Sequence, residues 1–172
     1  MTNDLCGPVI RAVEEFLKRD SNLLDVTAHE QAISHRIAVY LEHFFQWRPG
    51  LNIDCEYYKH LDTSKTGDLD VSYFEAMRSK FGECECRSCT HPEFEKFPNK
   101  LLRPDILVHS RGNDNANLIV IEIKREGVCA FDLTKLEALT RPKAKGGRFG
   151  YALGLFLHFS GGNAAYEWFS AS

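Results

Sequence analysis

Residues 102–110, LRPDILVHS, and residues 117–126, NLIVIEIKRE, decide the fold, and the turn formers GNDN at residues 112–115 lie between them. Both stretches are rich in Ile, Leu and Val, which are typical of buried strands, whereas Gly, Asn and Asp favour tight turns. The sequence therefore predicts two antiparallel strands joined as a hairpin.

The polar residues of this hairpin fall where they can meet. Side chains of a strand alternate between its two faces, so Glu122 and Lys124 share one face. Asp105 opens the neighbouring strand and can lie beside Glu122 at one end of the sheet. The opposite face carries three residues with a better claim to the core, Ile119, Ile121 and Ile123.

Two carboxylates and a lysine in one place suit a metal-dependent hydrolytic site. Mg²⁺ prefers oxygen ligands, usually one or two carboxylates with water and phosphate oxygens completing its shell. A bound metal lowers the pKa of a coordinated water and neutralises charge on a phosphate, and a nearby lysine stabilises the transition state. We therefore expect Asp105 and Glu122 to bind Mg²⁺ or Mn²⁺ and Lys124 to position the attacking water.

Outward from the hairpin, the apolar spacing predicts a mixed α/β (α+β) domain of 172 residues, with a central mixed sheet flanked by helices. Residues 60–100 break the pattern and are interpreted as an insertion between the first two strands, with a short helix at residues 71–81. The tail at residues 163–169 fits a helix or a strand equally well. The other predicted elements are helices at residues 10–19, 28–47 and 130–141, and strands at residues 52–59 and 149–159.

The motif and the order of these elements resemble the PD-(D/E)XK nuclease superfamily. Pro104-Asp105 and Glu122-Ile123-Lys124 match its motif, and the resemblance covers roughly residues 28–160 without the insertion. It implies a restriction-endonuclease-like αβββαβ core and metal-dependent cleavage of nucleic acid. Members often add an acidic residue from the helix before the first strand, and Glu30 takes that place here, where the resemblance implies that it touches the Mg²⁺ ion directly or through water. Gln31 and His35 are weaker candidates on the same helix.

Each of these residues also has a plainer interpretation. Glu122 and Lys124 could form a surface ion pair on an edge strand, and Glu30 could be the glutamate of a capping box that begins at Thr27. Asp132 and Lys135 lie on the helix after the hairpin, where we expect solvated side chains rather than residues lining a cleft.

Several basic residues are candidates for phosphate contacts. Lys143, Lys145 and Arg148 belong to a glycine-containing loop, which suits phosphate contact or is simply solvated. Arg103 and Arg125 flank the motif and could meet phosphates or act as charge partners of nearby acids.

The insertion contains a compact cysteine cluster with the spacing C-x-C-x2-C-x-H. Four such ligands suit a structural, tetrahedral Zn²⁺, with Cys55 or His60 as possible replacements for one of them. A reduced loop and a redox switch are the alternatives. Cys6 and Cys129 are interpreted as ordinary thiols. The cluster consists of Cys84, Cys86, Cys89 and His91.

Charge and hydropathy limit the choice of partner. The net charge of −3 argues against a protein that coats nucleic acid non-specifically. No segment approaches the length of a membrane span, and the N-terminus lacks a signal-peptide pattern, so we expect a cytoplasmic protein. The expected function is a metal-dependent nuclease acting on DNA, with RNA as the open alternative and a homodimer or a partner protein as a further possibility. The other hypothesis is an inactive nuclease-fold module, stabilised by zinc, that binds protein or nucleic acid.

Overall fold

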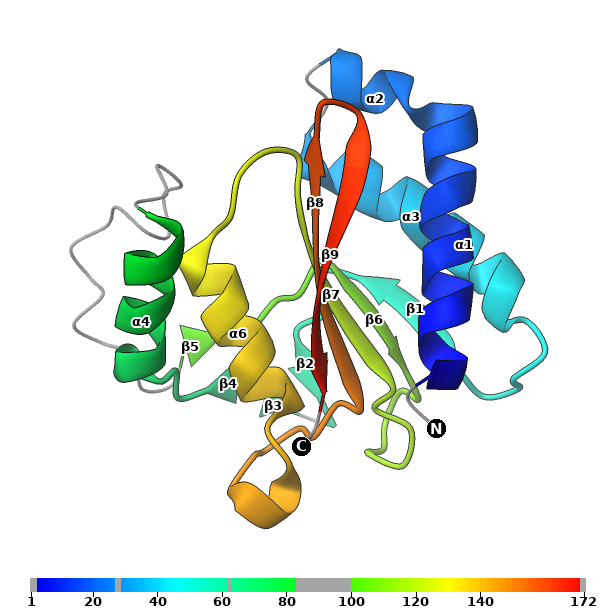
Figure 1. The fold of residues 1–172 in the computed structure, drawn as a ribbon. Coiled ribbons are helices and arrows are strands. Elements are labelled where there is room, and N and C mark those ends of the chain that lie inside the picture. The colour runs from blue at the N-terminus through cyan, green and yellow to red at the C-terminus, as the bar shows by residue number, and fades with distance from the viewer. Residues whose placement is uncertain (1–2, 27–28, 62, 83–99, 171–172) are drawn as a thin grey trace.

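A five-stranded mixed sheet forms the centre of the molecule (Figure 1). The computed structural model describes residues 3–26, 29–61, 63–82 and 100–170. The strands lie in the order β1-β6-β7-β8-β9. Their bounds are β1 Asn52–Cys55, β6 Ile106–His109, β7 Ile119–Lys124, β8 Leu153–Ser160 and β9 Asn163–Ser170.

The predicted hairpin is present at the middle of this sheet. Strands β6 and β7 are antiparallel, with Ile106 opposite Ile121. Strand β8 then pairs parallel to β7, while β1 and β9 form the two edges. Since β7 is the central strand, the interpretation of Glu122 and Lys124 as a pair on an edge strand is wrong.

Helices cover both faces of the sheet, as predicted. Ile119, Ile121 and Ile123 pack in one core with the buried residues of α1 and α3, whereas Val120 packs in a second core with α6. Figure 1 shows α1 and α3 on one side of the sheet and α4 and α6 on the other. The class is therefore mixed α/β. The helices are α1 Asn3–Asp20, α2 Asn22–Asp25, α3 Glu30–Phe45, α4 Val71–Phe81 and α6 Ala130–Thr140.

The chain between the neighbouring strands β1 and β6 carries α4 and two small two-stranded sheets, β2-β3 and β4-β5. The predicted strand at residues 52–59 is too long, because β1 ends at Cys55 and Lys59 belongs to β2. The short elements are β2 Lys59–His60, β3 Thr63–Ser64, β4 Thr66–Gly67, β5 Lys100–Leu101 and the 3₁₀ turn η2 Lys143–Lys145.

The undecided tail is the strand β9, which pairs antiparallel with β8. All residues of β8 except His158 and Ser160 are buried, which agrees with a strand covered on both faces. Within the described residues, no helix is both long and apolar enough to cross a membrane.

Candidate active site

The hairpin brings two carboxylates of the motif to one end of the sheet. Asp105 directly precedes β6, and its Oδ2 accepts a hydrogen bond of 2.6 Å from the backbone N–H of Ile123 in β7. Glu122 lies one residue earlier in β7 and is only 1% exposed. Sequence alternation placed Glu122 and Lys124 on the face opposite the isoleucines, and the two cores agree with that placement.

Helix α6 adds two charged residues that the sequence analysis expected in solvent. Asp132 is 6% exposed and Lys135 is 8% exposed, so that expectation is wrong. The reason is tertiary: α6 lies against β7 and β8, and the face with Asp132 and Lys135 meets the charged face of β7. Their spacing of three residues, which puts both on one helix face, was the available signal.

Five side chains form a row of alternating charge, which we call the charge chain: Glu30, Lys124, Asp132, Lys135 and Glu122. Lys124 Nζ lies 2.9 Å from Glu30 Oε2 and 3.4 Å from Asp132 Oδ2. Lys135 Nζ lies 3.1 Å from Asp132 Oδ1 and 2.7 Å from Glu122 Oε2. The charge chain thus connects α3, β7 and α6 through side chains that are mostly buried.

Helix α3 contributes Glu30, and the capping box predicted between Thr27 and Glu30 stays untested. The N-cap is His29, so Glu30 is the first helical residue, and Thr27 lies outside the described residues. Both carboxylate oxygens of Glu30 are engaged, because Oε1 also accepts from the Arg125 backbone N–H at 3.3 Å. Gln31 instead donates to Glu56 at 2.7 Å, and His35 is exposed, so neither joins the charge chain.

Burial and neighbouring charges shift the acids in different directions. Burial raises the pKa of Asp105 to about 6, against the opposing effect of Lys135. Burial also raises the pKa of Glu122, helped by the nearby charges of Asp105 and Asp132. Burial acts to raise the pKa of Asp132 as well, but Lys135 and Lys124 outweigh it, so this pKa is lowered.

Both lysines of the charge chain stay protonated. Burial acts to lower the pKa of each, but the surrounding carboxylates outweigh burial and raise both pKa values. Lys124 therefore acts as a hydrogen-bond donor and not as a base. For the Lys135–Glu122 pair, we conclude that the lysine holds its charge firmly, whereas the glutamate is short of positive charge.

The site contains more negative than positive groups. Asp105 lies close enough to raise the pKa of Glu122, so it adds to the three carboxylates of the charge chain and its two lysines. Glu122 Oε1 is the buried side-chain oxygen that has no hydrogen-bond partner among the described residues. An acceptor of this kind is expensive to bury unless a donor or a cation reaches it.

The carboxylates of the site determine whether a metal ion can bind there. Within the part of the chain that the structure describes, no group of three or more His, Cys, Asp or Glu side chains is arranged to hold a metal ion. Mg²⁺ needs no such cage, because one or two carboxylates suffice when water and phosphate complete its shell. Asp105 and Glu122, with the unpaired Oε1, therefore fit a Mg²⁺ or Mn²⁺ ion.

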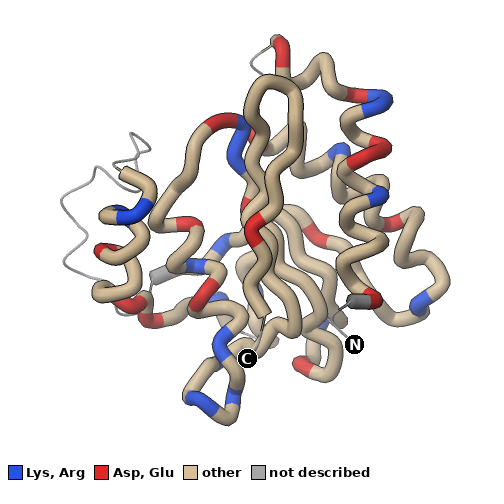
Figure 2. Tube along the Cα trace, viewed as in Figure 1, with Lys and Arg blue, Asp and Glu red and all other residues tan. Residues whose placement is uncertain are grey.

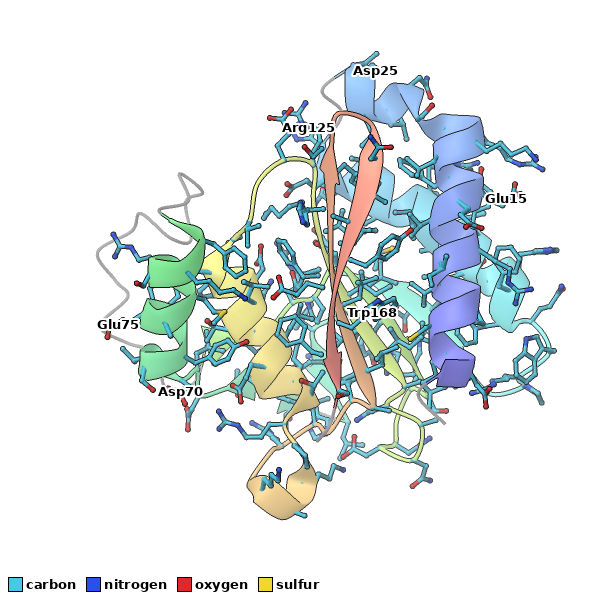
Figure 3. The ribbon with its side chains drawn as sticks, viewed as in Figure 1. Glu15, Asp25, Asp70, Glu75, Arg125 and Trp168 are labelled. Atoms are coloured by element: carbon cyan, nitrogen blue, oxygen red, sulfur yellow. The ribbon has the colours of Figure 1, made fainter. Side chains whose placement is uncertain are left out.

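Of the two arginines that flank the motif, Arg103 has a protein partner. Arg103 lies 3.9 Å from Glu56, as expected for a charge partner, and remains 56% exposed. Arg125 follows Lys124 directly and is labelled in Figure 3 in the loop after β7. Both remain candidates for phosphate contacts beside the motif.

The basic glycine loop lies at the other end of the molecule. Figure 2 shows its Lys and Arg positions gathered below the sheet, away from the loop that follows β7. Lys143 lies 2.9 Å from Asp114, and Arg148 donates to the backbone oxygen of Thr66 at 2.9 Å. Lys145 is exposed. The structure therefore does not bring this loop to the charge chain.

Most of the predicted zinc ligands lie outside the described residues, namely Cys84, Cys86, Cys89 and His91. Of the two replacement ligands, Cys55 is exposed at the end of β1, and His60 lies 2.9 Å from Asp114. Cys129 is buried and Cys6 is partly buried. The zinc site stays a prediction.

Comparisons of the chain with protein-family models, curated proteins and solved structures give no match. The resemblance to PD-(D/E)XK nucleases therefore depends on the motif residues and the order of the elements.

Proposed function

We propose that this protein is a metal-dependent nuclease that hydrolyses phosphodiester bonds, with DNA as the expected substrate. One observation carries the proposal: Asp105 lies on the strand neighbouring Glu122 at one end of a buried hairpin, close enough to act on its charge, and Glu122 has a buried oxygen without a hydrogen-bond donor among the described residues. A divalent cation would supply the missing charge, and it would also act as a Lewis acid that polarises the phosphate and activates a bound water.

The order of the elements supports the same proposal. Helix α3, strands β1, β6 and β7, helix α6 and strand β8 follow one another around the sheet, apart from the elements between β1 and β6. This is the order expected of a restriction-endonuclease-like core. A shared fold alone does not give a function, and the acids and lysines at the site supply the chemistry.

The proposed roles follow from charge and exposure. Asp105 and Glu122 would hold the metal. Lys124 is protonated, is 19% exposed, and can donate to an attacking water or a phosphate oxygen. Glu30 positions Lys124 through the 2.9 Å contact of its Oε2. Arg103 and Arg125, beside the motif, are candidates for contacts with the phosphates of the substrate.

The test is cleavage of supercoiled plasmid, linear duplex, single-stranded DNA and RNA with Mg²⁺, Mn²⁺ or EDTA. We expect the wild type to cut at least one substrate, with loss of cutting in EDTA and in Lys124→Ala. The matched control is Lys18→Ala, since Lys18 is an exposed lysine on α1 that pairs loosely with Glu15 at 4.0 Å. It should cut like the wild type.

Three outcomes would count against the proposal. Cutting that persists in Lys124→Ala would indicate a contaminant or a wrong role for Lys124. Cutting that survives EDTA would exclude the metal. No cutting of any substrate, together with no binding of Mg²⁺ or Mn²⁺ in calorimetry, would mean that the site is not a nuclease centre.

An inactive binding module is the second candidate, and one observation favours it. Lys135 already lies 2.7 Å from Glu122, so an ion pair serves that carboxylate without any metal. In such a module the charge chain would only hold α3, β7 and α6 together. Calorimetry with Mg²⁺ separates the two candidates. A metal site predicts a binding heat in the wild type that Asp105→Ala loses, whereas a purely structural charge chain predicts no binding heat in either protein.

A further inference from the structure

Lys135 lies where a cation is needed. Its Nζ is 2.7 Å from Glu122 Oε2 and 3.1 Å from Asp132 Oδ1, and all three residues are buried. The charge of Asp105 acts on Lys135 as well, so three carboxylates surround one ammonium group. Since a buried carboxylate without a positive partner is costly, this ammonium is what lets Glu122 be buried.

The neutralisation by Lys135 is incomplete. Glu122 Oε1 has no hydrogen-bond partner although it is buried. Asp132, in contrast, has both oxygens engaged, because Lys124 lies 3.4 Å from Oδ2 and Lys135 lies 3.1 Å from Oδ1. Of the two carboxylates that share Lys135, Glu122 is therefore the one that gains most from a further cation.

We propose that Lys135 is a tethered counter-ion of the metal site, which a divalent cation displaces from Glu122 and which then remains on Asp132. This inference rests on the metal site of the proposed function. It adds a competition: the lysine and the metal neutralise the same carboxylate, so one weakens the binding of the other. Lys135 also holds Glu122 in place when no metal is bound.

The geometry makes this exchange easy. Asp132 and Lys135 are three residues apart on α6, so Lys135 keeps a carboxylate partner on its own helix after it leaves Glu122. The Phe131 ring lies 5.8 Å from its Nζ and offers a second favourable contact. Only the end of one flexible side chain has to move, and neither β7 nor α6 is disturbed.

Lys124 differs from Lys135 in this respect. Among the described residues, its ion pairs are with Glu30 and Asp132 and not with Glu122. Lys65 provides a matched control, since it is also a buried lysine but donates to Tyr151 Oη at 3.1 Å and lies over the Phe149 and Tyr151 rings. The same substitution at Lys65 removes a buried ammonium without changing the charge at the carboxylates.

The experiment compares wild type, Lys135→Met and Lys65→Met by calorimetric titration with MgCl₂ and by thermal unfolding in EDTA or in MgCl₂. Lys135→Met should bind Mg²⁺ at least about tenfold more tightly than the wild type, the effect of about 1.4 kcal/mol. Its unfolding temperature should fall in EDTA and recover in MgCl₂ by more than that of the wild type. Lys65→Met should bind Mg²⁺ like the wild type and show the wild-type response to MgCl₂.

A variant that is unfolded in EDTA still gives an answer. Circular dichroism would then follow refolding of Lys135→Met as MgCl₂ is added, and the proposal requires refolding. Failure to refold, or Mg²⁺ binding no tighter than in the wild type, would overturn the role of Lys135 while leaving the nuclease proposal intact. Tighter Mg²⁺ binding by Lys135→Met, together with a wild type that cuts no substrate, would uphold the role of Lys135 as a counter-ion and refute the nuclease. Absence of metal binding in every variant would refute both.

Discussion

Asp105→Asn should make the metal-free protein more stable. Burial raises the pKa of Asp105 from 3.8 to about 6, so the folded chain holds this carboxylate in its charged form at a cost. A raised pKa of this size corresponds to about 3 kcal/mol of unfolding free energy, since each pKa unit is worth about 1.4 kcal/mol. Asparagine has no charge to bury, and its oxygen can still accept from the Ile123 N–H.

The sign of the pH dependence is specific. Because the folded state binds the Asp105 proton more tightly than the unfolded state, the wild type loses stability as the pH rises from about 4 to about 6. Asp105→Asn lacks this loss. Its advantage should be near zero below that range and reach about 2 kcal/mol above it, with about 3 kcal/mol as the upper limit.

Urea unfolding in EDTA, followed by circular dichroism at a series of pH values, measures this difference. In thermal unfolding at neutral pH, we expect the melting temperature of the variant to lie about 4–8 °C above that of the wild type, because about 1 kcal/mol shifts the melting temperature of a domain of this size by about 2–4 °C. Added MgCl₂ should stabilise the wild type alone and narrow the gap. A variant less stable than the wild type, or an advantage equally large in acid, would refute the reasoning.

Asp54→Asn is the matched control, because the same substitution should act in the opposite direction. Burial acts to raise the pKa of Asp54, but hydrogen bonds from Arg111 and His109 outweigh burial and lower it. The charged form is therefore favoured in the folded state. Asp54→Asn should destabilise the protein at neutral pH, and stabilisation by both variants would mean that charge removal in general, and not the Asp105 site, explains the effect.

Three further predictions concern other parts of the chain. Burial lowers the pKa of Lys65 to about 8. Lys65→Met should therefore raise the free energy of unfolding, measured with urea at neutral pH, by about 1–2 kcal/mol. This gain should shrink as the pH rises through about 8 to 10.5, because the folded wild type then loses its buried charge. Gly154→Ala would put a Cβ at 2.8 Å from Thr140 Cγ2, so thermal unfolding should show a loss of about 1–3 kcal/mol, and an unchanged melting temperature would contradict the packing of α6 on β8. Glu30→Gln should lower kcat about tenfold with little change in KM, because Lys124 loses one charge-assisted contact of about 1.5 kcal/mol. The fall in kcat should be equal for substrates of every length, whereas a fall that depends on length would indicate that Glu30 acts in substrate binding.

The core of the candidate site could be predicted from local rules. Alternation along one strand is enough to put Glu122 and Lys124 on the face opposite three isoleucines, and a short turn is enough to bring Asp105 back beside that strand. These relations involve residues close in the chain, so the sequence determined them without knowledge of the fold.

Tertiary packing decided the rest. Asp132 and Lys135 look like a solvated helix pair in the sequence, and they are buried only because α6 returns across β7 and β8 and puts its charged face against Glu122. Lys143, Lys145 and Arg148 look equally suited to phosphate contact. Yet Lys143 pairs with Asp114 in the turn between β6 and β7, and Arg148 donates to Thr66, so this loop lies away from the charge chain, below the sheet in Figure 2.

The strand order was a second tertiary outcome. Nothing in the sequence of residues 117–126 distinguishes an edge strand from a central one, and only the parallel pairing of β8 makes β7 central. That position removes Glu122 from water and makes its charge dependent on Lys135. The sequence by itself therefore determined which residues share a face, whereas the tertiary structure decided which of them are buried and what neutralises them, because burial depends on segments far apart in the chain.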